Sequence, residues 1–319
     1  MAMSRSTRSR RTASLLGALL VGLFASACGG SDEDDATRSD RRGTHAEAVK
    51  LLHAAVAPGN RAARSGRVDG RVELTLKGVR ALSEPFSVGV SGPYRYRRGA
   101  SLPDYELEMG VRDNGVGLTS LEGRSWVSLG STGYRLPAEI RRRLVRSSAR
   151  GRNGLTRTLE QFGIAPWRWE TDQQIAGTTR LDGADVTHIT TGFTAGRILE
   201  DANTLLGLMA SLRLTRATGL PDVIPARARR IIVRSVTHKE GHQWVGVKDG
   251  AIHRSGFTMK FTIPMADRAK VGGISSGTVV GELNVTEVGR PQQISAPASI
   301  GSFPDFLQGV DAVGDAQGG

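Results

Sequence analysis

The sequence lacks the residues for disulfide stabilisation, because it contains a single cysteine, Cys28. No disulfide can form within the chain, so the fold must rely on its hydrophobic core. Beyond residue 27 no apolar run reaches the length of about 18 residues that indicates a membrane-spanning helix. Aromatic residues make up only 5% of the chain and are not interleaved with clustered arginines, which argues against nucleic-acid binding.

The motifs of common enzymes are also missing. Residues 273–277 match the pattern G-x-S-x-G, with Ser275 in the nucleophile position, but no helix is predicted after them and no histidine follows His253. His238, Glu240 and His242 could suggest a metal site, with His253 nearby in a paired strand, but their spacing is not that of H-E-x-x-H. We therefore predict no enzymatic activity, no catalytic residue, no metal and no cofactor.

The N-terminus has the parts of a bacterial export signal in order. Arginines precede an apolar run over residues 14–24, and three small residues, 25–27, precede Cys28. This stretch resembles the lipobox of bacterial lipoproteins, which implies a signal peptide over residues 1–27 and an acyl anchor on Cys28. The alternative is ordinary cleavage after Ala27 that leaves Cys28 as a free thiol. Residues 28–43 are polar and charged and are interpreted as a flexible tether.

Positive charge remains after the signal peptide is removed. The formal net charge is +12, and the loss of the four arginines in residues 1–27 leaves +8. The remaining arginines are spread along the chain and favour weak attraction to anionic lipid headgroups over a nucleic-acid site.

Periodicity predicts an α+β protein in which short helices interrupt long antiparallel meanders. Thr44 and Glu47 are spaced as a capping box, and a helix from Thr44 should end at Pro58. Alternating strands follow over residues 72–129, with Asn114-Gly115 as a hairpin turn, and a second hairpin is expected further on with Asp182-Gly183 as its turn. Later strands are expected over 231–236, 244–247, 257–263 and 279–288 and near residue 294, before a loosely docked tail from residue 303.

Three central segments are expected to be helical, and the short middle one contains Leu155, Leu159 and Phe162. Residues 137–144 carry the run Arg141-Arg142-Arg143, which is either a solvated helix face or a patch for lipid headgroups. The longest helix should extend from Thr194 to about Thr215, and its apolar residues occupy more than one narrow face. This helix should therefore be deeply packed or should line an apolar space. Trp167 and Trp169 are interpreted as core residues, with a pocket mouth or a membrane contact as the alternative.

The order of lipobox, acidic tether, first helix, antiparallel meander and central helices resembles the LppX/LprAFG lipoproteins of actinobacteria, as does the closing run GVKDGAIHRSGFTMKFTIP. Those proteins are in turn similar to the LolA/LolB carriers. The resemblance implies one domain over residues 44–300, followed by a C-terminal tail over residues 301–319. It also implies a strongly curved antiparallel sheet, a half-barrel, with helices packed across its concave face.

The same resemblance implies an extracytoplasmic lipoprotein that binds acyl lipids or lipoglycans in an apolar cavity, for transport or presentation in the cell envelope. Its expected partners are the lipid ligand, the membrane that holds the anchor, and an export partner in the envelope. The alternative is an anchored interaction or sensor module with a closed core. The candidate lipid-lining residues, which a filled core would explain equally well, are Leu74, Leu76, Phe86, Val88, Leu107, Met109, Leu205 and Met209.

Overall fold

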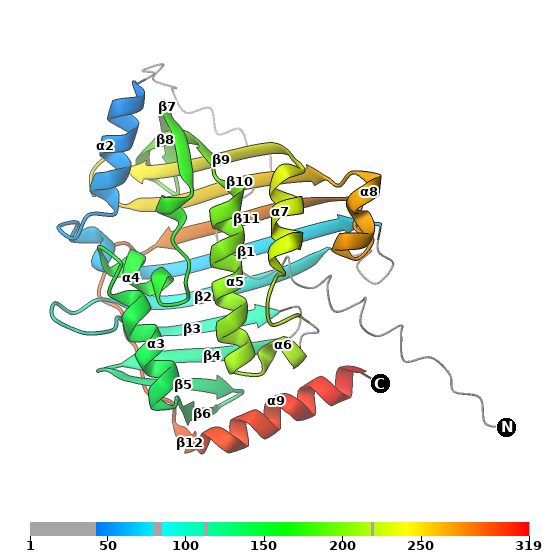
Figure 1. Cartoon of the computed structure of the whole chain (residues 1–319). Helices are drawn as coiled ribbons and strands as arrows, with labels where there is room; N and C mark the ends of the chain where they lie inside the picture. Colours follow the sequence, from blue (N-terminus) through cyan, green and yellow to red (C-terminus); the bar gives the residue numbers. More distant parts are fainter. Residues whose placement is uncertain (1–42, 79–84, 112–113, 218–219, 319) are drawn as a thin grey trace.

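The computed structural model describes residues 43–78, 85–111, 114–217 and 220–318. The predicted signal peptide, Cys28 and most of the predicted tether lie outside these residues. Within them the backbone forms one twelve-stranded sheet with helices laid across one of its faces (Figure 1). No helix in this part of the chain is long and apolar enough to cross a membrane.

The sheet is open and almost entirely antiparallel. Its strand order is β12-β6-β5-β4-β3-β2-β1-β11-β10-β9-β8-β7, and only the edge pair β12 and β6 is parallel. The predicted class, an α+β fold built on a curved antiparallel sheet with helices on its concave face, is confirmed. The strands are β1 (Ser65–Lys77), β2 (Phe86–Arg95), β3 (Asp104–Val111), β4 (Asn114–Leu121), β5 (Arg124–Leu129), β6 (Thr132–Arg135), β7 (Glu170–Leu181), β8 (Ala184–Phe193), β9 (Val236–Gly246), β10 (Ile252–Thr262), β11 (Ser276–Thr286) and β12 (Ser299–Gly301).

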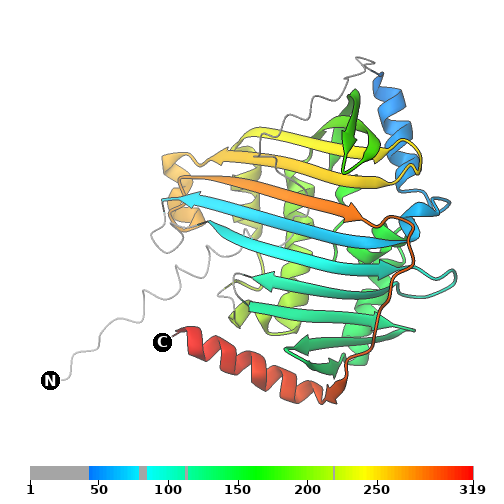
Figure 2. The same ribbon diagram turned by 180° about the vertical axis from the view of Figure 1, so that it is seen from behind.

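The helices form a layer that leaves the opposite face of the sheet uncovered by helices, as Figure 2 shows from behind. Strand β1 explains why the layer lies on one face only: its side chains alternate between buried and more exposed along the strand, and the buried ones include Val72 and Leu74. The helices are α2 (His45–Ala55), η2 (Ala62–Arg64), α3 (Ala138–Ser148), α4 (Gly154–Glu160), η4 (Pro166–Arg168), α5 (Ala195–Ser211), α6 (Leu214–Ala217), α7 (Ala226–Arg234), α8 (Met265–Arg268), η5 (Ala269–Val271) and α9 (Phe303–Gly318).

Several local predictions are confirmed. Thr44 and Glu47 form the capping box at the start of α2, with the Thr44 amide donating to the Glu47 carboxylate at 2.7 Å. The turn at Asp182-Gly183 has positive φ at both residues, as a tight hairpin requires. The long helix expected from Thr194 is α5, and it buries residues over a broad part of its surface.

Three local predictions are wrong. Residues 226–234 form helix α7 where a strand was expected over 231–236, because Pro225 starts a helix whose Ala228, Ile231 and Ile232 share its buried face. The last strand, β12, lies at residues 299–301 and not near residue 294. Asn114 and Gly115 are residues of β4 and not a turn, since Asn114 pairs with Val111 and Gly115 with Gly110.

The C-terminal segment is not a loose tail. Helix α9 places Phe306 and Val310 in the main hydrophobic core, at 0% and 2% exposure. Phe306 also packs against Tyr134 of β6, with ring centroids 5.6 Å apart. These contacts bury apolar side chains that a tail in water would expose. The proposed boundary at residue 300 therefore does not separate this segment from the core.

Candidate functional site

The predicted lipid-lining residues come together in the main core. All eight are buried, with exposed fractions between 1% and 5%, and all belong to one continuous apolar cluster. Strand pairing places Leu74 opposite Phe86, and helix α5 supplies Leu205 and Met209. Side chains with so little accessible surface are in contact with other protein atoms, so this part of the interior is filled. Their contact with a lipid stays a prediction.

Helix α5 is held mainly by the rest of the helix layer. Arg143 of α3 donates to the Gly207 and Thr204 carbonyl oxygens at 3.1 and 3.2 Å. The Asp201 carboxylate accepts hydrogen bonds from the Ala165 amide and from Trp169 Nε1, both at 2.8 Å. Asp201 is buried, and burial raises its pKa. The polar contacts described for α5 thus lead to neighbouring helices and connecting segments, while its apolar residues belong to the core shared with the sheet.

A second apolar cluster lies under α2. Ala48, Leu52 and Ala55 of α2 pack against Ile189 of β8 and Val245 of β9. The turn before α4 is tied to α2, because the buried Asn153 side chain donates to the Ala55 carbonyl oxygen at 2.8 Å. The small cluster is separate from the main core.

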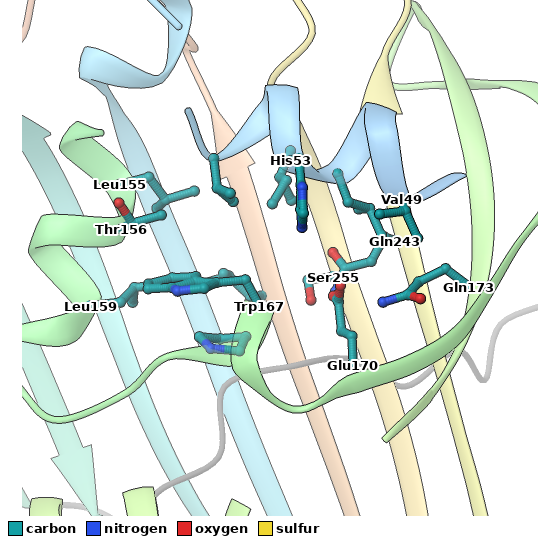
Figure 3. A pocket seen from close by; sticks show the side chains of 15 residues that line it. Val49, His53, Leu155, Thr156, Leu159, Trp167, Glu170, Gln173, Gln243 and Ser255 are labelled. Carbon is teal, nitrogen blue, oxygen red and sulfur yellow. The ribbon is translucent and has the colours of Figure 1, made fainter. Parts of the chain in front are cut away.

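A small cavity lies where these two clusters meet (Figure 3). Its volume is about 50 Å³. Ligand cavities that enclose a whole small molecule measure about 300–1,000 Å³, so this space admits a small group but no complete acyl chain. The lining residues come from α2, α4, η4 and the strands and are Val49, Leu52, His53, Val56, Leu155, Thr156, Leu159, Pro166, Trp167, Glu170, Gln173, Gln243, Ile252, Ser255 and Leu283.

The lining also includes six polar side chains: His53, Thr156 and Gln173, and the group of Glu170, Gln243 and Ser255, all labelled in Figure 3. Gln243 Nε2 donates to Glu170 Oε1 at 2.6 Å. Gln243 Oε1 and Ser255 Oγ are buried and have no hydrogen-bond partner among the residues that the structure describes. Burial raises the pKa of Glu170 to about 7, although the hydrogen bond from Gln243 acts in the opposite direction and lowers this pKa. We call Glu170, Gln243 and Ser255 the polar triad.

The sequence analysis did not identify the polar triad. One signal was available: Gln243 lies two residues before Val245 in β9, so it occupies the inward-facing side of a strand where an apolar residue is expected. Trp167, which was interpreted as a core residue or as part of a pocket mouth, lines the cavity and is partly buried. Trp169 is 3% exposed and belongs to the main core.

Of the histidines considered as metal ligands, His238 and His242 lie beside Glu240, with their Nε2 atoms 3.6 and 3.3 Å from its carboxylate oxygens. His242 Nδ1 lies 3.1 Å from His188 Nε2, while His253 Nε2 lies 2.9 Å from Asp249 Oδ2. In the part of the chain that the structure describes, no group of three or more His, Cys, Asp or Glu side chains is arranged to hold a metal ion.

No protein-family model matches the chain, and no curated protein matches it in sequence. Among solved structures it is similar to the lipoprotein LppX of Mycobacterium tuberculosis, with a TM-score of 0.37 and 14% identity over 79% of this chain and 100% of that one. It is also similar to LprF from Mycobacterium bovis, with a TM-score of 0.39 and 12% identity over 80% of this chain and 98% of that one.

The chain is similar in fold to LppX and LprF. A protein of the DUF1329 family from Desulfovibrio piger is also similar, with a TM-score of 0.21 and 10% identity over 78% of this chain and 92% of that one.

Proposed function

We propose that this protein is an extracytoplasmic lipoprotein, anchored through Cys28, that binds an acyl lipid or lipoglycan between its sheet and its helix layer. It would transport or present that lipid in the cell envelope, without catalysing a reaction. The main observation is how α5 packs on the concave face of the sheet, along an interface that we call the seam. Apolar side chains fill this seam, and the polar contacts described for α5 lead elsewhere in the helix layer.

Such a seam can open without leaving buried polar groups unpaired. An acyl chain entering it would replace contacts between apolar side chains with contacts of the same kind. Each methylene removed from water contributes about 0.8 kcal/mol, so a chain of about 16 carbons gains on the order of 12 kcal/mol before the cost of separating the layers. Because the interior around Leu205 is filled, loading requires the helix layer to move away from the sheet.

The predicted signal peptide and lipobox support the proposed location. An acyl anchor on Cys28 would hold the domain at the outer face of the cell membrane, and the polar residues after it would let the domain reach lipids in that surface. A net charge of +8 after removal of the signal peptide would favour anionic headgroups at the membrane.

The proposal is tested by analysing lipids that copurify with the protein. Residues 29–319 are expressed in an actinobacterium, purified without detergent and extracted with organic solvent for mass spectrometry. We expect acyl lipid in stoichiometric amount, and we expect Leu205→Trp, which overfills the seam, to lower it at least tenfold. The control Val247→Trp alters a side chain that is 56% exposed and should leave the lipid content unchanged.

A second function is favoured by the filled interior. The low exposure of Leu74, Phe86 and Leu107 is what a closed interaction or sensor module would show. A protein that purifies folded and free of lipid, and that remains so after incubation with envelope lipids, would support this alternative and contradict lipid binding.

A further inference from the structure

The cavity between the two apolar clusters contains polar groups that the protein itself does not satisfy. Gln243 is 5% exposed and Ser255 is 2% exposed, and within the described part of the chain Gln243 Oε1 and Ser255 Oγ have no hydrogen-bond partner. A buried polar atom left unpaired costs about 1–3 kcal/mol. Two such atoms facing one small cavity indicate that the cavity receives a group able to bond with both.

The chemistry of this group follows from what each atom needs. Gln243 Oε1 is a carbonyl oxygen and needs a donor, whereas Ser255 Oγ can donate or accept. A hydroxyl group both donates and accepts, so a single hydroxyl can satisfy both atoms. The cavity of about 50 Å³ has room for a hydroxymethyl group, since one water needs roughly 10–15 Å³ by the same measure.

The charge of the group follows from the rest of the lining. Among the described lining residues, Glu170 and His53 are the only ionisable ones, and His53 lies on the exposed side of α2. None of the lysines and arginines in the described ranges lines the cavity, so none compensates a phosphate or carboxylate there. An anion placed beside Glu170 would meet a like charge whenever Glu170 is ionised and would lose its hydration without compensation.

We propose that the polar triad of Glu170, Gln243 and Ser255 binds an uncharged, hydroxyl-bearing headgroup of a lipid. This inference rests on the proposed lipid binding and adds the class of headgroup. The hydroxyl donates to Gln243 Oε1 and bonds with Ser255 Oγ, while the Gln243 amide remains oriented by Glu170. The acyl chains extend from the cavity along the apolar surfaces of α4 and the sheet, where Leu155, Leu159 and Leu283 line its edge.

The test uses the full chain carrying Cys28→Ser, which removes the acylation site. It is incubated with phosphatidylcholine vesicles that contain one of three radiolabelled probes: dioleoylglycerol, its 3-O-methyl ether, or dioleoyl phosphatidic acid. The protein is then separated from the vesicles and the bound probe is counted. We expect dioleoylglycerol to bind at least tenfold more tightly than the ether, which cannot donate, and than the anionic probe.

Two serine variants distinguish a loss of binding specific to the polar triad from a general effect of removing a buried serine hydroxyl. Ser255→Ala should weaken dioleoylglycerol binding about tenfold and leave its affinity close to that of the ether. Ser125→Ala is the matched control, because Ser125 is also a buried strand serine at 2% exposure with an unpaired hydroxyl, but it does not line the cavity. Ser125→Ala should bind all three probes as the parent chain does.

The outcomes distinguish this inference from the proposed function. Equal affinity for dioleoylglycerol and its ether, unchanged by Ser255→Ala, would overturn the headgroup assignment and leave lipid binding intact; the triad would then bind only water. Tighter binding of phosphatidic acid would also overturn the assignment. Failure of all three probes to bind would overturn both the headgroup assignment and the proposed function.

Discussion

Replacing Glu170 with glutamine should stabilise the protein above neutral pH and have little effect in acid. The pKa of Glu170 is raised by burial from 4.5 to about 7. Between these values the unfolded chain releases a proton that the folded chain retains, so the free energy of unfolding falls as pH rises. One pKa unit corresponds to about 1.4 kcal/mol, which gives a penalty of about 3 kcal/mol above pH 7.

The variant Glu170→Gln removes this penalty and retains the acceptor for Gln243 Nε2. The difference in unfolding free energy between the variant and the parent should be near zero below pH 4.5. It should grow through the interval up to pH 7 and then level off at about 3 kcal/mol. Glu160, whose pKa burial also raises to about 7, is present in both proteins and cancels from the difference.

Urea unfolding of residues 29–319, followed by tryptophan fluorescence from pH 4 to pH 8.5, measures this difference. Glu139→Gln, on the exposed surface of α3, controls for the loss of one carboxylate. A Glu170→Gln variant whose stability runs parallel to the parent across the whole range would refute the conclusion that Glu170 sits in an environment that disfavours its charge.

Three further predictions concern other parts of the molecule. Asp201→Ala should lower the free energy of unfolding by about 3 kcal/mol, because it leaves the buried Trp169 Nε1 donor unpaired. Asp201→Asn should lower it less. Urea unfolding and near-UV circular dichroism test this, and equal losses in the two variants would contradict it. Thr44→Ala should cost about 1 kcal/mol by removing the cap of α2, and an unchanged thermal midpoint would contradict it. Cys28→Ala should move the protein out of the membrane fraction of the producing bacterium, and full retention there would refute acylation at Cys28.

The elements with strong local signals could be predicted from the sequence. The capping box at Thr44 defined the start of α2, and period-two alternation in residues 72–76 defined the buried face of β1. Signals of this kind depend only on neighbours along the chain. The apolar run at 231–236 was predicted wrongly because β-branched residues favour a strand locally, whereas the helix that begins after Pro225 buries Ile231 and Ile232 on one face.

The candidate site depended far less on local signals. The eight predicted lining residues were identified as apolar and inward-facing, but the sequence could not separate a filled core from a cavity, since both select the same residue types. The polar triad was missed because its members come from three strands separated in the sequence, and nothing local marks Ser255 as a neighbour of Gln243.

The sequence by itself determined the alternation of the strands, the broad apolar surface of α5 and the absence of a disulfide framework. These properties follow from composition and from periodicity over a few residues. Only the tertiary structure decided that α9 joins the core, that the interior around Leu205 is filled, and that Gln243 and Ser255 face one cavity. Each of these depends on how distant segments approach one another, because burial and hydrogen-bond satisfaction are properties of the packed chain.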